Sequence, residues 1–157
     1  MIQAASHCEP DRPAAGPGGL ARWRRAIVQG NDSFEAGDAP AALAAYRQAL
    51  DLARGLPPGT EDAVAALVVS HHNLARLHEA AGRADEAAGH VCEAHETLCA
   101  RAADAAAGHG AREAAWRHSR VTRAELLRFL QRHPGHDRAS RAARLWPGDG
   151  PAQTLPH

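Results

Sequence analysis

Hydrophobic and polar residues along this chain follow the period of an amphipathic helix, and no segment shows the strict alternation of a half-buried strand. Breaks rich in glycine or proline divide the pattern into long stretches. We therefore expect an all-α protein. The predicted helices cover residues 20–36, 39–54, 61–81, 84–105 and 111–132, and a short helix over 138–145 also fits the pattern.

Backbone signals mark where several of these helices end and begin. Gly37 can adopt the left-handed conformation that ends a helix, and Gly82 repeats this signal after the third helix. Asp38 and Thr60 carry side-chain oxygens that can accept hydrogen bonds from the first free N–H groups of the next helix. Pro40 falls in a first turn, where its missing N–H costs nothing.

A repeated arrangement of small and large residues links two parts of the chain. Residues 30–50 can be aligned with residues 75–95. Small residues in both helices of a pair let the two backbones approach closely, and a larger residue fills the gap beside them. The matching pairs are Gly30 with Ala75, Gly37 with Gly82, Ala42 with Ala87, Tyr46 with Val91, and Ala49 with Ala94.

This pattern resembles the tetratricopeptide repeat (TPR), a helix–turn–helix unit of about 34 residues. The likeness, which is to a short bacterial-type TPR protein, covers residues 23–100 and is strongest over 73–87. The repeat here is longer, because Gly30 and Ala75 lie 45 residues apart. The resemblance implies a TPR-like α-hairpin solenoid of about two repeats. The helix over 111–132 then either caps the array at its C-terminal end, which we favour, or begins a third repeat.

Composition divides the chain into three parts. Residues 1–19 are rich in Pro, Gly and Ala without periodicity, and they are predicted to be disordered. Residues 20–133 form the predicted TPR-like helical domain. Residues 134–157, rich in Pro, Gly and Arg, are predicted to form a flexible tail.

Repeats of the TPR kind usually bind a peptide or a partner protein in the concave groove lined by their first helices. The resemblance therefore implies a scaffold or adaptor for protein–protein interaction. Arginine offers a planar fork of donors that suits a carboxylate, which favours an acidic or carboxylate-bearing partner. The groove positions that the resemblance implies are Arg24, Ile27, Asn31 and Phe34 in the first helix, Val69, His72, Asn73, Arg76 and Glu79 in the third, and Arg117 and Val121 in the fifth.

Charge and hydropathy limit the other classes of partner. All 18 basic residues are Arg and many follow residue 111, but no nucleic-acid-reading motif accompanies them, so we expect no nucleic-acid partner. No apolar run reaches the ~20 residues of a membrane span, and the first residues lack the apolar core of a signal peptide. The prediction is a cytoplasmic protein without a membrane partner. Self-association stays open, because short repeat arrays expose apolar faces.

One face of the fourth helix carries Cys92, His95 and Cys99 at positions i, i+3 and i+7. Thiolate and imidazole are zinc ligands, so the alternative function is a Cys/His metal-binding or redox-sensing helical protein. Against it, the chain has no C-x-x-C pair, and its three cysteines are expected to be reduced thiols that fill a helical core. His71 and His78, seven positions apart on one face, are predicted to replace core aromatic residues.

Catalytic motifs are missing from the sequence. It has no glycine-rich phosphate loop, no G-x-S-x-G and no H-E-x-x-H. Acidic residues are scattered over helix positions that we expect to face solvent, so no carboxylate pair is arranged for acid–base catalysis. We therefore expect a protein that is not an enzyme and uses no cofactor.

Overall fold

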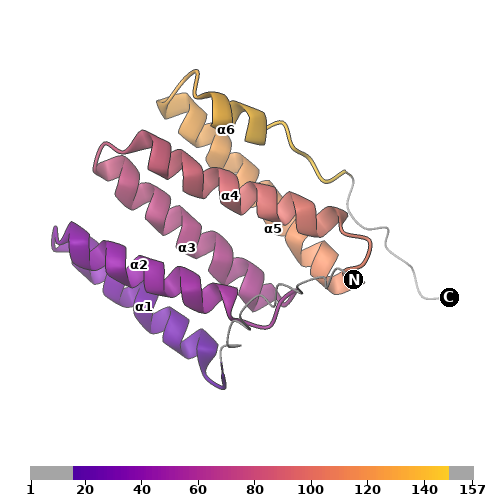
Figure 1. Ribbon diagram of the computed structural model, residues 1–157, viewed down its shortest axis with the longest axis horizontal. Coiled ribbons are helices and arrows are strands. Elements are labelled where there is room, and N and C mark those ends of the chain that lie inside the picture. Colours follow the sequence, from indigo (N-terminus) through magenta and orange to yellow (C-terminus); the bar gives the residue numbers. More distant parts are fainter. Residues whose placement is uncertain (1–15, 149–157) are drawn as a thin grey trace, which may run out of the picture.

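Six α-helices joined by short turns form the part of the chain described by the computed structural model, residues 16–148 (Figure 1). The prediction of an all-α protein is confirmed for this part. Most of the predicted disordered segment and the last nine residues lie outside the described residues, and none of the described helices is long and apolar enough to cross a membrane. The helices are α1 (Gly19–Glu35), α2 (Ala39–Arg54), α3 (Glu61–Ala80), α4 (Ala84–Ala103), α5 (His109–Arg132) and α6 (Asp137–Ala142).

The predicted caps form at two helix starts. Asp38 Oδ1 and Thr60 Oγ1 each accept a hydrogen bond from the backbone N–H three residues further on, at 3.1 and 3.2 Å. Gly37 and Gly82 have φ angles of 77° and 72°, in the left-handed region that ends a helix. The bounds of the first five helices lie within two residues of the predicted ones, and the largest differences are that α4 ends at Ala103 and that α5 begins at His109. The first turn leaves its N–H groups without helical partners in any case, so it tolerates the glycines of this break.

Each helix packs against the next one along the chain, and α3 also contacts both α1 and α5. Figure 1 shows α2, α3 and α4 side by side, with α1 and α5 behind them. The four small residues predicted to lie at the helix crossings are Gly30, Ala42, Ala75 and Ala87, and all four are buried. Small side chains at these points let the helix backbones approach each other.

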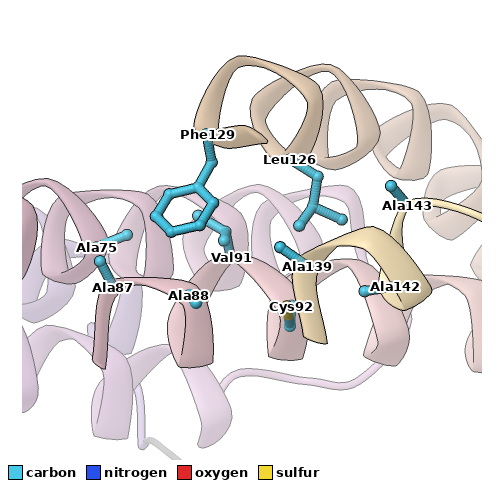
Figure 2. Packing of buried hydrophobic residues seen from close by; sticks show 10 residues of the cluster. All are labelled: Ala75, Ala87, Ala88, Val91, Cys92, Leu126, Phe129, Ala139, Ala142 and Ala143. Atoms are coloured by element: carbon cyan, nitrogen blue, oxygen red, sulfur yellow. The ribbon is translucent and has the colours of Figure 1, made fainter. Parts of the chain in front are cut away.

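A cluster of buried side chains joins the C-terminal half of the structure (Figure 2). Leu126 and Phe129 point from α5 toward Val91 on α4, and Ala139 of α6 closes the gap from the other side. Phe129 is only 1% exposed in a cluster whose other members are mostly alanines, and the rings of His133 and His136 pack against it at centroid distances of 4.5 and 5.6 Å. A few larger side chains among small residues thus fill the space between three helices.

The helical domain extends past residue 133, where the predicted domain ends. Part of the predicted flexible tail forms α6, which packs against both α4 and α5 and buries Ala139 and Ala142. The short helix expected over 138–145 is therefore present, somewhat earlier in the chain. Six residues are too few for a stable isolated helix, so packing against α4 and α5 stabilises it. Consequently α5 is not the last helix of the described residues, as the prediction of a single C-terminal helix had it.

Candidate functional site

A groove of about 420 Å³ lies between α3 and α5. Four of the predicted groove residues form its α3 wall, because steps of three and four residues bring them to one face of the helix. The remaining wall comes from α4 and α5. The lining residues are His72, Asn73, Ala75, Arg76 and Glu79 of α3, Val91 of α4, and Glu125 and Arg132 of α5.

The imidazole of His72 contributes a polar atom without a partner. Its Nε2 is buried and has no hydrogen-bond partner among the described residues. Burial lowers the pKa of His72, while Glu125 opposes this shift and Arg128 adds to it. The ring is therefore neutral at neutral pH. A buried nitrogen without a hydrogen bond is costly, so a ligand group that bonded to it would be favoured.

The carboxylates of the groove are already neutralised by α5 and the turn after it. Glu79 accepts two hydrogen bonds from Arg132, at 2.7 and 3.1 Å, and its Oε1 lies 2.7 Å from Nε2 of His133. The hydrogen bond from Arg132 is the main cause that holds the pKa of Glu79 below its ordinary value, and that from His133 adds to it. Glu125 pairs with Arg128 at 2.7 Å and with Arg132 at 3.6 Å.

Arg76 is the remaining cation of the groove, and the ion pairs of the described residues do not include it. Its side chain is exposed, and its guanidinium carbon lies 4.8 Å from the centre of the Phe34 ring on α1. This cation–π contact orients the guanidinium group without neutralising it. The planar fork of donors stays free for an anionic group.

The predicted groove residues of α1 are not brought into this groove. Asn31 Oδ1 accepts a hydrogen bond from the hydroxyl of Tyr46 at 2.8 Å, so Asn31 fastens α1 to α2. Ile27 and Phe34 are half-buried against the core between these helices. Arg24 is exposed in a separate hollow lined by α1 alone. Of these four residues, Phe34 contacts a groove residue, Arg76, but does not itself line the groove.

Arg117 of α5 also lies apart from the groove lining. Its guanidinium group bonds to Glu61 at 2.7 Å and to Glu113 at 2.9 Å, which ties α5 to the start of α3. Val69 and Val121, also carried over by the resemblance, are 38% and 51% exposed. They add apolar surface on α3 and α5.

Cys92, His95 and Cys99 are buried on α4. Among the described residues, their ligand atoms do not form a group close enough together to hold a metal ion. Both ring nitrogens of His95 are occupied, by Thr122 Oγ1 at 2.9 Å and by the carbonyl oxygen of Leu145 at 3.1 Å. Burial raises the pKa of the Cys92 thiol to about 11 and also raises that of Cys99. Both thiols are therefore protonated at neutral pH, whereas a metal ion binds the thiolate.

A second histidine cluster, which the sequence spacing does not reveal, lies between α3 and α4. His71 and His78 are buried, as predicted, and the ring of His90 lies beside both, with centroid distances of 5.4 and 5.5 Å. Burial, with a further contribution from His90, lowers the pKa of His71 to about 3. Ligand atoms of His71, His90 and Glu93 all lie within 4.8 Å of one another. The sequence signal for this trio is weak because its members come from two helices.

Comparison with known proteins places the chain in a family without an assigned activity. The profile of a family described as "Protein of unknown function (DUF2753)" matches residues 21–146. This range includes almost all of α1 and every other described helix, so α6 is part of the family unit. No curated protein and no solved structure matches the sequence.

Proposed function

This chain belongs to the protein family DUF2753, whose description assigns no activity, and we propose that it is a protein-interaction scaffold. Its groove between α3 and α5 binds an acidic or carboxylate-bearing segment of a partner protein. One observation carries this proposal: Arg76, whose guanidinium group is in no ion pair of the described residues, and His72, whose buried Nε2 has no hydrogen-bond partner there, line the same groove.

We infer a TPR-like arrangement of three hairpins, α1–α2, α3–α4 and α5–α6, because α3 contacts both α1 and α5. Stacked hairpins of this kind would bring their first helices to one face, where the groove lies. Burial of Gly30 and Ala42 in the first hairpin, and of Ala75 and Ala87 in the second, supports like packing in both. In this arrangement α5 begins a third repeat, with α6 as its second helix.

The charges of the groove favour a carboxylate over a cation. Arg132 pairs with Glu79 and Arg128 pairs with Glu125, so these two acidic groups do not repel an incoming anion. Arg76 can form two parallel hydrogen bonds to a carboxylate, and such pairs are among the strongest in proteins. His72 can donate from Nε2 in its neutral form, and Asn73 beside it offers an amide for a peptide backbone.

The test is a binding measurement on the full chain with a library of acidic peptides that end in a free carboxylate. The same library with amidated C-termini and with Asp and Glu replaced by Asn and Gln is the ligand control. We expect Arg76→Glu to weaken binding at least about tenfold, since it replaces a charge-assisted pair by a repulsion. His72→Leu should weaken it by a smaller factor, because it removes one neutral donor.

Arg144→Glu is the matched control. Arg144 is exposed and lies just after α6, and its substitution by Glu changes the net charge by the same amount as Arg76→Glu. It should bind like the unaltered chain. Equal losses in Arg76→Glu and Arg144→Glu would show a nonspecific charge effect and contradict the proposal. So would equal binding of the charged peptides and their amide counterparts.

A further inference from the structure

The cluster of His71, His90 and Glu93 lies apart from the proposed groove. His71 belongs to α3, while His90 and Glu93 are three residues apart on α4 and therefore share one face of that helix. His72, the next residue along α3, lines the groove toward α5 instead. His71 and His72 thus lie on different faces of α3, one beside α4 and the other in the groove toward α5.

The two imidazoles have the separation that a tetrahedral metal ion requires. The Nδ1 atoms of His71 and His90 lie 3.2 Å apart. Zinc–nitrogen bonds of about 2.0–2.1 Å at a tetrahedral angle place two nitrogens roughly 3.3 Å apart. In the metal-free chain one Nδ1–H donates to the other nitrogen. A metal ion between the two Nδ1 atoms would replace that proton. The ring that had carried it on Nδ1 would then carry it on Nε2, so that both Nδ1 atoms could coordinate the metal.

The surrounding residues hold these groups in position. His71 is 1% exposed, and His90 stacks on His78 with 14° between the ring planes. Arg54 donates to Oε1 of Glu93 at 2.9 Å, which fixes the carboxylate and leaves it a second oxygen. Metal ligands with such support are pre-oriented for binding.

Positive charge near the cluster works against a cation. Arg54 donates a hydrogen bond to Glu93, and the positive charges of Arg54 and Arg47 contribute to lowering the pKa of His90. Glu93 is the carboxylate that offsets them. Two imidazoles and one carboxylate suit a transition metal such as zinc, nickel or copper better than calcium or magnesium, which prefer ligand sets made wholly of oxygen.

We propose that His71, His90 and Glu93 form a binding site for a divalent transition-metal ion, with Zn²⁺ as its representative. The three side chains leave the fourth coordination position to water or to a group from outside. Because the ligands come from α3 and α4, the bound ion connects the two helices of one hairpin. Metal binding should therefore stabilise the folded chain.

The test uses the untagged full chain after treatment with a chelator, titrated with ZnCl₂ in a calorimeter and with Co²⁺ followed by its visible absorption. We expect saturation at one ion per chain. At about a hundredfold excess over Kd, Zn²⁺ should raise Tm by at least about 5 °C. His90→Gln and Glu93→Gln should each weaken binding tenfold or more, since each removes one of three ligands. Both residues are only partly buried, so these variants should fold, whereas a change at fully buried His71 would test folding as much as binding.

Two variants serve as controls. His118 faces Glu61 at 2.6 Å, so His118→Gln removes a histidine–carboxylate pair elsewhere on the surface. Cys92→Ala removes one of the three residues, Cys92, His95 and Cys99, whose spacing on α4 predicts an alternative metal site. Both should bind Zn²⁺ like the unaltered chain. The proposal is overturned if no one-to-one binding occurs, if His90→Gln and Glu93→Gln bind normally, or if a control variant loses binding equally.

Discussion

Gly30 faces the ring of Tyr46 so closely that no side chain fits between them. A Cβ atom added at residue 30 would lie 2.5 Å from Cδ1 of Tyr46, inside van der Waals contact. Tyr46 is 2% exposed and its hydroxyl donates to Asn31, so the ring cannot move aside without disturbing the core and this hydrogen bond. The crossing of α1 and α2 depends on this contact.

Gly30→Ala should therefore destabilise the protein although alanine is the better helix former. Overpacking a tight core position costs about 1–3 kcal/mol, and the gain in helix propensity returns up to about 1 kcal/mol. We expect a net loss of roughly 1–2 kcal/mol in the free energy of unfolding, measured by urea denaturation.

Gly89→Ala is the matched control, because Gly89 also lies inside a helix. A Cβ there would meet its nearest neighbour, Nη1 of Arg138, at 3.6 Å, which is an ordinary contact. This variant should be about 0.5–1 kcal/mol more stable than the unaltered chain. In a Tyr46→Ala background the penalty of Gly30→Ala should largely disappear. An unchanged penalty there would show that Tyr46 is not its cause.

The features that the sequence predicts correctly depend on neighbouring residues. Gly37, Asp38 and Thr60 determine helix ends through their own backbone or side-chain chemistry. The burial of Ala42 in α2 and of Ala87 in α4 also follows from the sequence pattern of the hairpin to which each belongs. Such predictions are reliable because they depend on contacts between residues that are close together in the sequence.

Features that the sequence misses depend on how separate helices meet. His71 and His90 come together only because α3 and α4 pack in one particular register. Asn31 was expected in the groove, but the approach of Gly30 to Tyr46 turns it toward the tyrosine hydroxyl. The helix α6 has little apolar surface of its own, so its docking depends on the space that α4 and α5 leave.

Ala139→Asp should release α6 from the rest of the structure. Ala139 is fully buried in the cluster with Leu126 and Phe129, and a carboxylate there would lose its hydration without gaining a partner. We expect a loss of about 2 kcal/mol and faster amide hydrogen exchange in α6 and on the facing side of α5. Arg144→Asp, at an exposed position, should show neither effect. Unchanged exchange in Ala139→Asp would mean that α6 does not pack as described.

The ion pairs of Glu79 should make stability depend on pH. Hydrogen bonds from Arg132 and His133 lower the pKa of Glu79 in the folded chain. A depressed folded-state pKa contributes stability above the ordinary carboxyl value, and this stability is lost as the pH falls through the folded-state value. Glu79→Gln should thus cost about 1 kcal/mol at pH 7 and less at pH 3, which lies below the ordinary carboxyl pKa. Glu35→Gln, at an exposed position outside the ion pairs of the described residues, should show no such pH dependence. Equal losses at both pH values would contradict this role of the carboxylate.

Cys92 and Cys99 should resist thiol reagents in the folded protein. Cys92 is fully buried and Cys99 is 9% exposed. With a pKa of about 11, only roughly 3 in 10,000 Cys92 side chains are thiolates at pH 7.5, and the thiolate is the reactive form. Cys8, the third cysteine of the sequence, is replaced by Ser so that only Cys92 and Cys99 can react. In this background, we expect modification by a disulfide reagent to be limited by unfolding, and to be complete within minutes in 6 M guanidinium chloride.

An accessible thiol in the same protein is the control for this experiment. Ala44→Cys, placed on the exposed face of α2, should react at the rate of an unhindered cysteine. If Cys92 or Cys99 reacted as fast as this reference, the interior of α4 would open readily to solvent. A redox-sensing role for these cysteines would then gain support, because such sensors need an accessible thiolate. Slow reaction of both, beside fast reaction of the thiol introduced by Ala44→Cys, would instead mark them as packing residues.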